Sequence, residues 1–418
     1  MRKALIAALG CVWPLWGHTQ TFTGFPPAQP PLSGQELIPA DTGANPPSVV
    51  ISTDQLAQFV TSFDPGQNWI IAGDAGQNLF QRGVVGPTTS GPVVFGPDRW
   101  AYWSGTSTPV VVSEDLTSGV TPPGFNAAYK MQRQSGASGV SQMCLAQVLS
   151  STNSVSLQGS FVELDFNVFG GAGLSSPLVR IYIVSGTGVN EGVGKLAFGV
   201  NGGGGGSVGW VGQTNVVSAN FSPLAPGTLA HPAVVGRLPI NETEVAVAFC
   251  VFPSGTAGGA DYLDFSGIQM RLAPALAPFA SPVTAYIAAA LQVPPFVWRI
   301  GYQEAFLQYA YYWQRNEGAG LDVIGGPCLS SISLRADCFF QFPVSMGQVP
   351  TMTFAAGFAT DANSGGITPC TGLAMTPGMV ATQLGVTIGC ATGVNVKTAT
   401  FLYENGGSGM ISADAELH

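Results

Sequence analysis

Charge is scarce in this sequence. Charged residues make up 9% of the 418 positions, whereas an ordinary soluble domain carries about a quarter. The formal net charge is −9, and no cluster of Lys or Arg interrupts the neutral background. A nucleic-acid partner needs a basic face, and attraction to an anionic membrane surface needs a polybasic segment. The composition therefore argues against both.

Histidine is scarcer still, and the cysteines are dispersed. The histidines are His18, His231 and His418, and no two of the seven cysteines form a CxxC pair. Because zinc sites need such ligands at close spacing, we expect no structural metal, and we expect no cofactor. Two of the histidines lie near the termini and His231 lies in a proline-rich loop, which argues against a nucleophile–histidine–acid triad.

The state of the cysteines is open. Four of the seven fall towards the C-terminus, at Cys328, Cys338, Cys370 and Cys390. One or two disulfides there would fit this grouping. Buried free thiols fit the odd total at least as well.

Long apolar runs are missing after the first twenty residues. No later stretch approaches the roughly 18–20 apolar residues that span a bilayer. Met1-Arg2-Lys3 and the apolar residues 4–16 resemble the basic start and hydrophobic centre of a signal peptide. Pro14 and two tryptophans interrupt the run, and no small-x-small cleavage site follows cleanly. Cleavage of residues 1–20 is therefore an open alternative.

Glycine and proline are abundant instead. The chain has 56 Gly and 31 Pro, and 46% of its residues are hydrophobic. Tight turns need Gly and Pro, so this composition favours β-sandwiches. A nearly neutral surface also suits proteins that bury much of it against copies of themselves. The length predicts two to three domains.

The expected fold is mainly β, in four segments. Residues 1–75 predict an extended attachment arm, because residues 23–50 are proline-rich, with a short helix at 55–60. Residues 76–272 alternate apolar and polar positions, which predicts a central antiparallel sandwich of the jelly-roll type. Residues 273–300 predict a linker with a short helix near 284–292. Residues 301–418 predict a smaller C-terminal β-sandwich domain.

One further helix is expected at 304–315. Its spacing places Phe306, Tyr309 and Trp313 on one face, with Tyr312 close by. We interpret this face as a seam between the two β domains or between neighbouring subunits.

Three local patterns resemble those of tailed-phage virion proteins. The first is Gln29-Pro30-Pro31-Leu32-Ser33-Gly34, followed by Ile51-Ser52-Thr53-Asp54-Gln55-Leu56-Ala57, which is similar to the start of many tail and head-fibre proteins. The second is Asn78-Leu79-Phe80-Gln81-Arg82-Gly83 with Gly96-Pro97-Asp98-Arg99-Trp100, which resembles a virion jelly roll related to carbohydrate-binding modules. The third combines Glu304-Ala305-Phe306-Leu307 and Tyr311-Tyr312 with the terminal Ala413-Asp414-Ala415-Glu416-Leu417.

The resemblance implies a homo-oligomeric fibre or spike subunit, often a trimer. Such a subunit would contact other virion proteins through its N-terminal arm and would meet glycans of the host surface. Where the family has Cys-Gln-Arg before the paired tyrosines, this chain has Gln308-Tyr309-Ala310. The expected location is the virion, and the alternative is an exported or cell-surface adhesin.

The densest aromatic and charged cluster is Asp98-Arg99-Trp100 with Tyr102 and Trp103. Aromatic rings stack on sugars and charged groups bind hydroxyls, so these five residues are the candidate binding site. The structural alternative is that Trp100 and Tyr102 pack the core while Arg99 and Trp103 face out or meet a neighbour. In that case Arg82 and Asp98 would pair.

Two carboxylate pairs are weaker candidates. Glu163 and Asp165 share one face of a strand, about 7 Å apart, as in an inverting glycosidase; a solvated sheet face with two acids is the alternative. Asp261 and Asp264 follow Gly258-Gly259 and could bind Ca²⁺, but their spacing matches no defined calcium loop, which favours a turn that leads into a strand. We expect a binding protein and not an enzyme, and the alternative is a glycan-depolymerising tailspike.

Overall fold

The computed structural model describes the following residues: 37–40, 49–52, 68–83, 85–88, 93–104, 108–117, 119–176, 178–196, 209–221, 226–273, 296–298, 301–316, 323–332, 335–354, 358–361, 367–370, 372–375, 381–382, 385–391, 400–404 and 410–416. The chain divides into two compact units, 1–65 and 66–418. In the first, β1 (Leu37–Ala40) pairs antiparallel with β2 (Val49–Ser52). The helices expected at 55–60 and 284–292 lie outside the described residues, as does nearly all of the expected linker 273–300.

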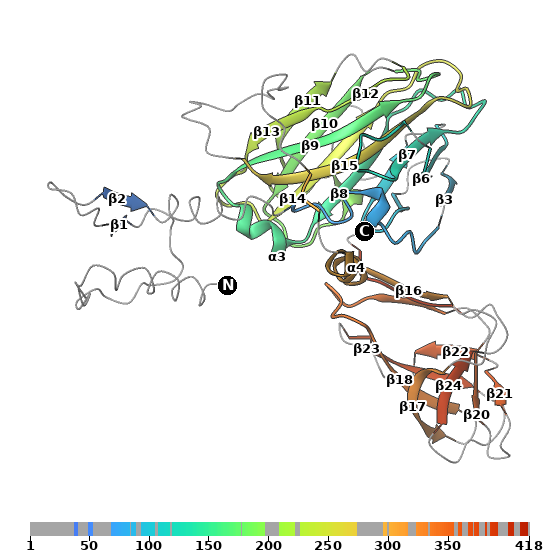
Figure 1. The fold of residues 1–418 in the computed structure, drawn as a ribbon. Helices are drawn as coiled ribbons and strands as arrows, with labels where there is room; N and C mark the ends of the chain where they lie inside the picture. The colour runs from blue at the N-terminus through green and yellow to red at the C-terminus, as the bar shows by residue number, and fades with distance from the viewer. Residues whose placement is uncertain are drawn as a thin grey trace. The chain divides into compact units, whose positions relative to one another are not determined.

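The second unit contains the central antiparallel sandwich, whose two sheets form layers in Figure 1. Sheet I has the order β11 (Thr214–Phe221), β10 (Val179–Gly186), β14 (Glu244–Val251), β8 (Met143–Leu149), β5 (Ala101–Ser104) and β4 (Val94–Phe95). Sheet II has the order β12 (Leu229–Ala230), β9 (Phe161–Gly170), β15 (Tyr262–Leu272), β7 (Ala128–Arg133), β6 (Val110–Asp115) and β3 (Val85–Thr88), with β13 (Ala233–Arg237) also paired to β9. Short helical turns are η2 (Ala75–Gln77), α3 (Ser151–Ser154), η3 (Val155–Leu157) and η4 (Val193–Lys195).

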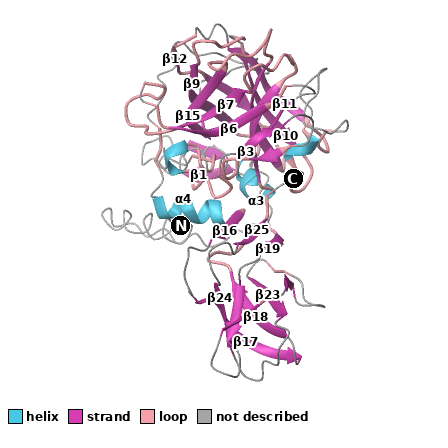
Figure 2. Cartoon of the chain, turned by 90° about the vertical axis from the view of Figure 1, so that its right-hand side faces the viewer, coloured by secondary structure: helices cyan, strands magenta, loops and turns pink. Residues whose placement is uncertain are grey.

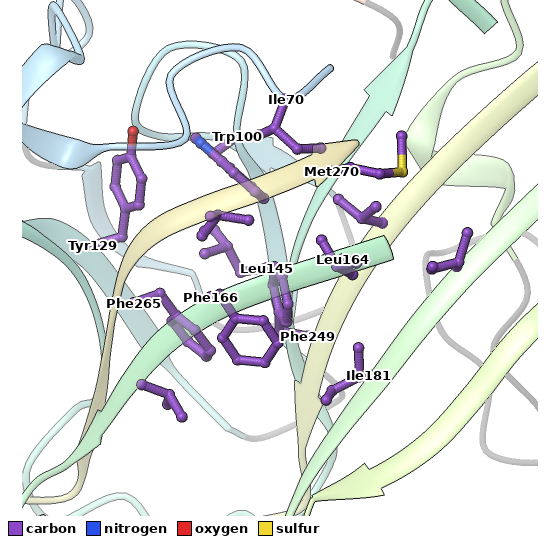
Figure 3. Packing of buried hydrophobic residues seen from close by; sticks show 14 of the residues in the cluster. Ile70, Trp100, Tyr129, Leu145, Leu164, Phe166, Ile181, Phe249, Phe265 and Met270 are labelled. Carbon is purple, nitrogen blue, oxygen red and sulfur yellow. The ribbon is translucent and has the colours of Figure 1, made fainter. Parts of the chain in front are cut away.

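Strand alternation produces the core between these sheets. Alternate residues of β9, among them Leu164 and Phe166, point toward sheet I. Phe249 of β14 meets them there, with its ring centroid 4.4 Å from that of Phe166 and 5.2 Å from that of Phe265. Figure 3 shows these rings interdigitating below Trp100. The predicted mainly β fold is confirmed.

The outer side of sheet I carries a second apolar cluster. Trp103, Tyr182 and Trp210 are buried there. Cys144 of β8 and Cys250 of β14 are directly opposed in the register and form a disulfide in this cluster. No pairing of these two cysteines was expected, because they are 106 residues apart in the sequence.

The C-terminal region contains two further sheets. Sheet III has the order β16 (Tyr312–Asn316), β25 (Met410–Asp414) and β19 (Thr351–Phe354). Sheet IV has the order β21 (Ile367–Pro369), β20 (Phe358–Asp361), β24 (Thr400–Glu404), β17 (Val323–Ile332), β18 (Arg335–Gln341), β23 (Gly385–Ala391) and β22 (Gly372–Met375). One core joins them, with Phe340 and Ile388 of sheet IV packed in the same cluster as Ile411 and Ala413 of sheet III.

The four C-terminal cysteines form two disulfides, Cys328–Cys338 and Cys370–Cys390. The alternative of free thiols is therefore wrong for these residues. Among the described residues, no helix is long and apolar enough to cross a lipid bilayer.

Helix α4 (Gly301–Tyr309) is shorter than expected, and its buried face is polar. It ends before Tyr312, which begins β16, and Figure 2 shows the two elements side by side. Glu304 and Gln308 are buried, whereas Phe306 is exposed. The prediction that Phe306, Tyr309 and Trp313 share one helical face at the junction of the two β domains is therefore wrong, because α4 ends before Trp313 and meets the sandwich through Glu304 and Gln308. The physical reason is that backbone amides of the sandwich face α4 and need hydrogen-bond partners. A seam with a neighbouring subunit stays a prediction.

Those amides belong to the segment that leads into sheet II. Glu304 accepts a hydrogen bond from the backbone N–H of Ala72. Gln308 accepts one from the N–H of Leu79 at 2.8 Å and donates one to the carbonyl of Gln77, also at 2.8 Å. Two polar side chains at i and i+4 thus fasten α4 to the sandwich.

Arg99 forms the centre of the junction between the sandwich and the C-terminal region. Its guanidinium binds the carboxylate of Glu416 and donates to the Val148 carbonyl at 2.6 Å. The same group lies 3.5 Å from the ring centroid of Tyr311. Both charged side chains are almost wholly buried. The pairing therefore compensates two desolvated charges at once.

Arg82 forms a similar arrangement with the neighbouring Tyr312 and with Asp414. Its guanidinium lies 3.5 Å from the ring centroid of Tyr312 and 3.1 Å from the carboxylate of Asp414. It also pairs with Asp98 at 3.6 Å, as the structural alternative predicted. Burial raises the pKa of the Asp98 carboxyl to about 6, although a hydrogen bond from Gln81 and the charge of Arg82 oppose the shift.

We predict that Glu416→Gln destabilises the protein by about 3–5 kcal/mol, because it leaves the buried Arg99 charge without its counter-ion. Urea unfolding of the purified chain measures the change. Lys195→Gln serves as control, since the Lys195 side chain is 58% exposed and its ion pair with Glu191 should be worth less than about 1 kcal/mol. Equal losses in both variants would contradict the role given to Glu416.

Candidate functional site

The outer face of sheet II, which is turned away from the core, carries aromatic and charged side chains. Alternate positions of three strands supply them. They are Glu163, Asp165, Asn167 and Phe169 from β9, Tyr262, Asp264, Gln269 and Arg271 from β15, and Lys130 and Gln132 from β7. The register sets Lys130, Asp264 and Phe169 in one row across the three strands.

A β-bulge in β15 decides which residues reach this face. The register against β9 shifts between Ser266 and Gln269, and Gly267 has φ +56°. A Cβ atom on Gly267 would lie 2.6 Å from the ring of Phe125, so a larger residue would clash there. The extra residue returns Ile268 to the core. Gln269 and Arg271 consequently share the outer face with Asp264.

Two half-buried rings and a lysine form an aromatic platform, which we define as Phe169, Tyr262 and Lys130. The ring centroids of Phe169 and Tyr262 lie 6.5 Å apart, with 28° between their planes. The Lys130 ammonium lies 4.0 Å from the Tyr262 ring centroid and 2.7 Å from the Asp115 carboxylate. The lysine is therefore fixed over the ring by a cation–π contact and by an ion pair.

Asp264 lies buried beside this platform. Neither oxygen of its carboxyl has a hydrogen-bond partner among the described residues. Burial raises its pKa to about 8, and the Asp115 charge adds to the shift while Lys130 opposes it. Asp115 behaves in the opposite way, because hydrogen bonds from Lys130 and Thr117 outweigh its burial and lower its pKa. Burial therefore favours the protonated, neutral form of the Asp264 carboxyl at neutral pH.

Glu163 and Asp165 point to the same face, as predicted, but the expected solvated position is wrong. Both are buried. Glu163 accepts a hydrogen bond from Arg271 at 2.8 Å. Asp165 contacts the His231 imidazole at 3.1 Å and accepts a hydrogen bond from Gln269 at 3.0 Å. Burial raises the pKa of Glu163, and the charge of Arg271 opposes this. These acids hold basic side chains in place.

A group of three aromatic rings flanks the same face at the bulge. Phe125, Phe296 and Trp298 have mutual centroid distances of 5.0–5.2 Å. The backbone N–H of Val297 donates to the Gln269 side chain at 3.1 Å, which ties the group to β15. Trp298 is exposed.

The five residues expected to bind a ligand all lie elsewhere and are buried. Trp100 and Tyr102 pack in the core, and Trp103 packs in the cluster outside sheet I. Asp98 and Arg99 belong to the junction described above. In this conformation their side chains offer no exposed ring or charged group to a ligand. The structural alternative holds for Trp100 and Tyr102, whereas Trp103 faces away from the core without reaching solvent.

Asp261 and Asp264, the other acidic pair, are separated. Asp261 binds the fully buried Arg133 at 2.7 Å, and that arginine also donates to loop carbonyls such as those of Gly139 and Gly255. The turn that leads into a strand is therefore the correct interpretation of this segment. In the described part of the chain, no group of three or more His, Cys, Asp or Glu side chains could hold a metal ion.

Sequence comparison gives no relative: no family model matches the chain, and no curated protein matches it either. The structure is similar to the enzymatically active domain of tailspike protein 4 of bacteriophage CBA120, at 11% identity and a TM-score of 0.27. That match covers 49% of this chain and 21% of the tailspike, so the chain spans about a fifth of the tailspike's length.

Two small domains are similar to the same degree. The xylan-binding domain from CBM 22 is 12% identical, with a TM-score of 0.26 over 43% of this chain and 89% of that domain. The K1 cleaved adhesin domain of Lys-gingipain from Porphyromonas gingivalis W83 is 15% identical, with a TM-score of 0.26 over 46% and 98%. Similarities at this level carry no argument about function.

We predict that Asp264→Asn raises thermal stability at pH 8 and that the gain shrinks towards pH 4. The unfolded carboxyl ionises near its usual pKa of about 4, whereas the folded one keeps its proton until about pH 8. The stability contributed by this group is thus complete below about pH 4 and is lost as the pH rises through that interval. Calorimetry across this range measures the effect.

Asp115→Asn is the matched control with the opposite sign. Its folded pKa is lowered, so its stabilising contribution is present at neutral pH and is lost in acid. That variant should therefore melt below the parent protein at pH 8. If Asp264→Asn also melted lower at pH 8, the assignment of a buried neutral carboxyl would be wrong.

Proposed function

We propose that this protein binds glycans through the aromatic platform on sheet II. The observation that carries the proposal is the fixed arrangement of Phe169, Tyr262 and Lys130 beside the buried Asp264. Sugar C–H faces stack on aromatic rings, and sugar hydroxyls accept hydrogen bonds from ammonium groups. All four residues lie on strands, whose hydrogen-bonded register holds them in place without a ligand.

We propose binding rather than cleavage as the activity. A glycosidase needs one carboxyl as acid and a second as base or nucleophile, both open to the substrate. Here Glu163 is held by Arg271, and Asp165 is held by His231 and Gln269. Both carboxyls are buried beneath their partners. This supports a role for the two acids in orienting side chains.

We also propose that the chain is a homo-oligomeric subunit of a virion fibre or spike that meets host-surface glycans. The support is that two of the three segments that resemble virion proteins, the sandwich segment and the terminal segment, meet in this structure. Arg82 and Arg99 from the sandwich segment bind Asp414 and Glu416 from the terminal segment, over Tyr311 and Tyr312. Repeated weak sites on such a subunit would give strong attachment through avidity.

Tyr262→Ala should weaken glycan binding by about tenfold or more, a loss of about 1.4 kcal/mol. The variant removes one of the two stacking rings and the cation–π partner of Lys130. Binding of the purified chain to immobilised bacterial capsular polysaccharides and lipopolysaccharides measures the effect. Phe339→Ala, which removes an exposed ring from sheet IV, is the control and should bind like the parent. Unchanged binding by a folded Tyr262→Ala would refute the platform.

A second candidate function is an exported bacterial surface adhesin. The three disulfides among the described residues favour it, because disulfides persist in oxidising compartments and are rare in the cytosol. The signal-like first residues point in the same direction.

N-terminal sequencing and mass spectrometry of the native chain separate the two candidates. The virion proposal expects the chain in purified phage particles with residues 1–20 retained. A mature chain that has lost those residues and is found on cell envelopes would contradict the virion proposal and support the adhesin.

The three disulfides predict that six of the seven cysteines react with an alkylating agent only after reduction.

A further inference from the structure

Acids and bases on the outer face of sheet II are layered. Three carboxylates, Asp115, Glu163 and Asp165, have side chains only 6%, 4% and 1% exposed. Each contacts a basic side chain that is more exposed: Lys130 at 22%, Arg271 at 15% and His231 at 39%. The face therefore presents hydrogen-bond donors to solvent and keeps its acids underneath.

The basic side chains of this face contrast with the acidic balance of the chain as a whole. The protein carries 23 acidic residues against 14 Lys and Arg, for a net charge of −9. Two of those few bases, Lys130 and Arg271, lie in the layer. Arg237 of β13 is a third, exposed on the same face with its guanidinium 5.6 Å from the Phe161 ring centroid. Burial of Asp264 as a neutral carboxyl removes a further negative charge from this region. A ligand here would meet bases and not acids.

The bases follow one strand. Lys130 is opposite Asp264, and Arg271 lies seven residues further along β15. At about 3.3 Å per residue this separates the two positions by roughly 20 Å. His231 contacts Asp165, which is opposite Gln269 between them. This row of basic side chains begins at the aromatic platform and passes the rings of Phe125, Phe296 and the exposed Trp298 at the bulge. This geometry suits an extended chain with repeated anionic groups.

We infer that the ligand of this face is an acidic polysaccharide, which lies along β15 with its carboxylates toward Lys130, His231 and Arg271. The inference rests on the proposed function and names its substrate class. Ammonium and guanidinium groups form charge-assisted hydrogen bonds with carboxylates that are about twice as strong as neutral ones. The buried acids beneath fix the orientation of these bases before a ligand arrives, which lowers the entropic cost of binding.

The test uses polymers that differ only in charge. Polygalacturonate, alginate and hyaluronan are each compared with their methyl esters, which keep the backbone and remove the negative charge. We expect the parent protein to bind at least one acid form about tenfold more tightly than its ester, a difference of about 1.4 kcal/mol. Arg271→Gln should remove most of that difference and leave binding of the ester unchanged. Lys130→Gln should also remove most of it, and it should weaken binding of the ester as well, because Lys130 belongs to the aromatic platform.

Matched variants guard against loss of the fold. Arg271→Gln leaves the buried Glu163 without its partner, so Arg271→Lys is measured beside it and should retain the preference for the acid form. Lys195→Gln, which removes an exposed lysine far from β15 in the sequence, should bind like the parent. Thermal unfolding of each variant confirms that it is folded.

The outcomes distinguish the inference from the proposed function. Equal binding of acid and ester, with both abolished by Tyr262→Ala, would overturn the acidic ligand and keep the platform. Failure of every acid polymer to bind would also overturn the inference. A single-stranded oligonucleotide that binds as tightly as the best polysaccharide would show that the bases recognise phosphate polyanions, and it would overturn the inference as well.

Discussion

Two arginines, Arg99 almost wholly buried and Arg82 partly buried, hold the sandwich and the C-terminal region together, and their removal from water makes the connection specific. A guanidinium removed from water loses several kcal/mol of hydration free energy, which is recovered only when a carboxylate and further acceptors meet it in the right geometry. Arg99 finds these partners in Glu416 and the Val148 carbonyl, with the Tyr311 ring against its plane. A different docking of the two parts would leave this charge uncompensated.

The same junction accounts for strained backbone in the sandwich. Ala72, Phe80 and Arg99 have φ of 52°, 47° and 71°, a region that residues with a Cβ atom seldom occupy. Such conformations persist only where surrounding contacts over-determine them. Here Glu304 binds the Ala72 amide, and Glu416 binds both the amide and the guanidinium of Arg99. These hydrogen bonds from the C-terminal region thus hold Ala72 and Arg99 in their strained conformations.

The outer face of sheet II shows a different balance. Its buried Asp264 has no hydrogen-bond partner among the described residues, and its acids support bases that the fold does not need for its core. A carboxyl that lowers stability at neutral pH is typical of a site whose arrangement serves binding. Gly267 makes this arrangement available, because the bulge brings Gln269 and Arg271 to the side occupied by Asp264 and the aromatic platform.

The sequence by itself determined the fold class and the strand-rich segments, because alternation along a strand is a local property. It left open whether Trp100 and Tyr102 bind a ligand or pack the core, and the structure places both in the core. The pairing of Arg82 with Asp98 was also predictable, because both residues belong to one short segment. Tertiary structure alone decided the rest. The Phe169–Tyr262 pair, the Cys144–Cys250 disulfide and the Arg99–Glu416 ion pair join residues that are 93, 106 and 317 positions apart. The burial of the polar face of α4 has the same origin. Its helical period was readable from the sequence, but the backbone amides that bind Glu304 and Gln308 belong to a distant part of the chain. Periodicity reports which side chains share a face, and only the packed structure determines what that face meets.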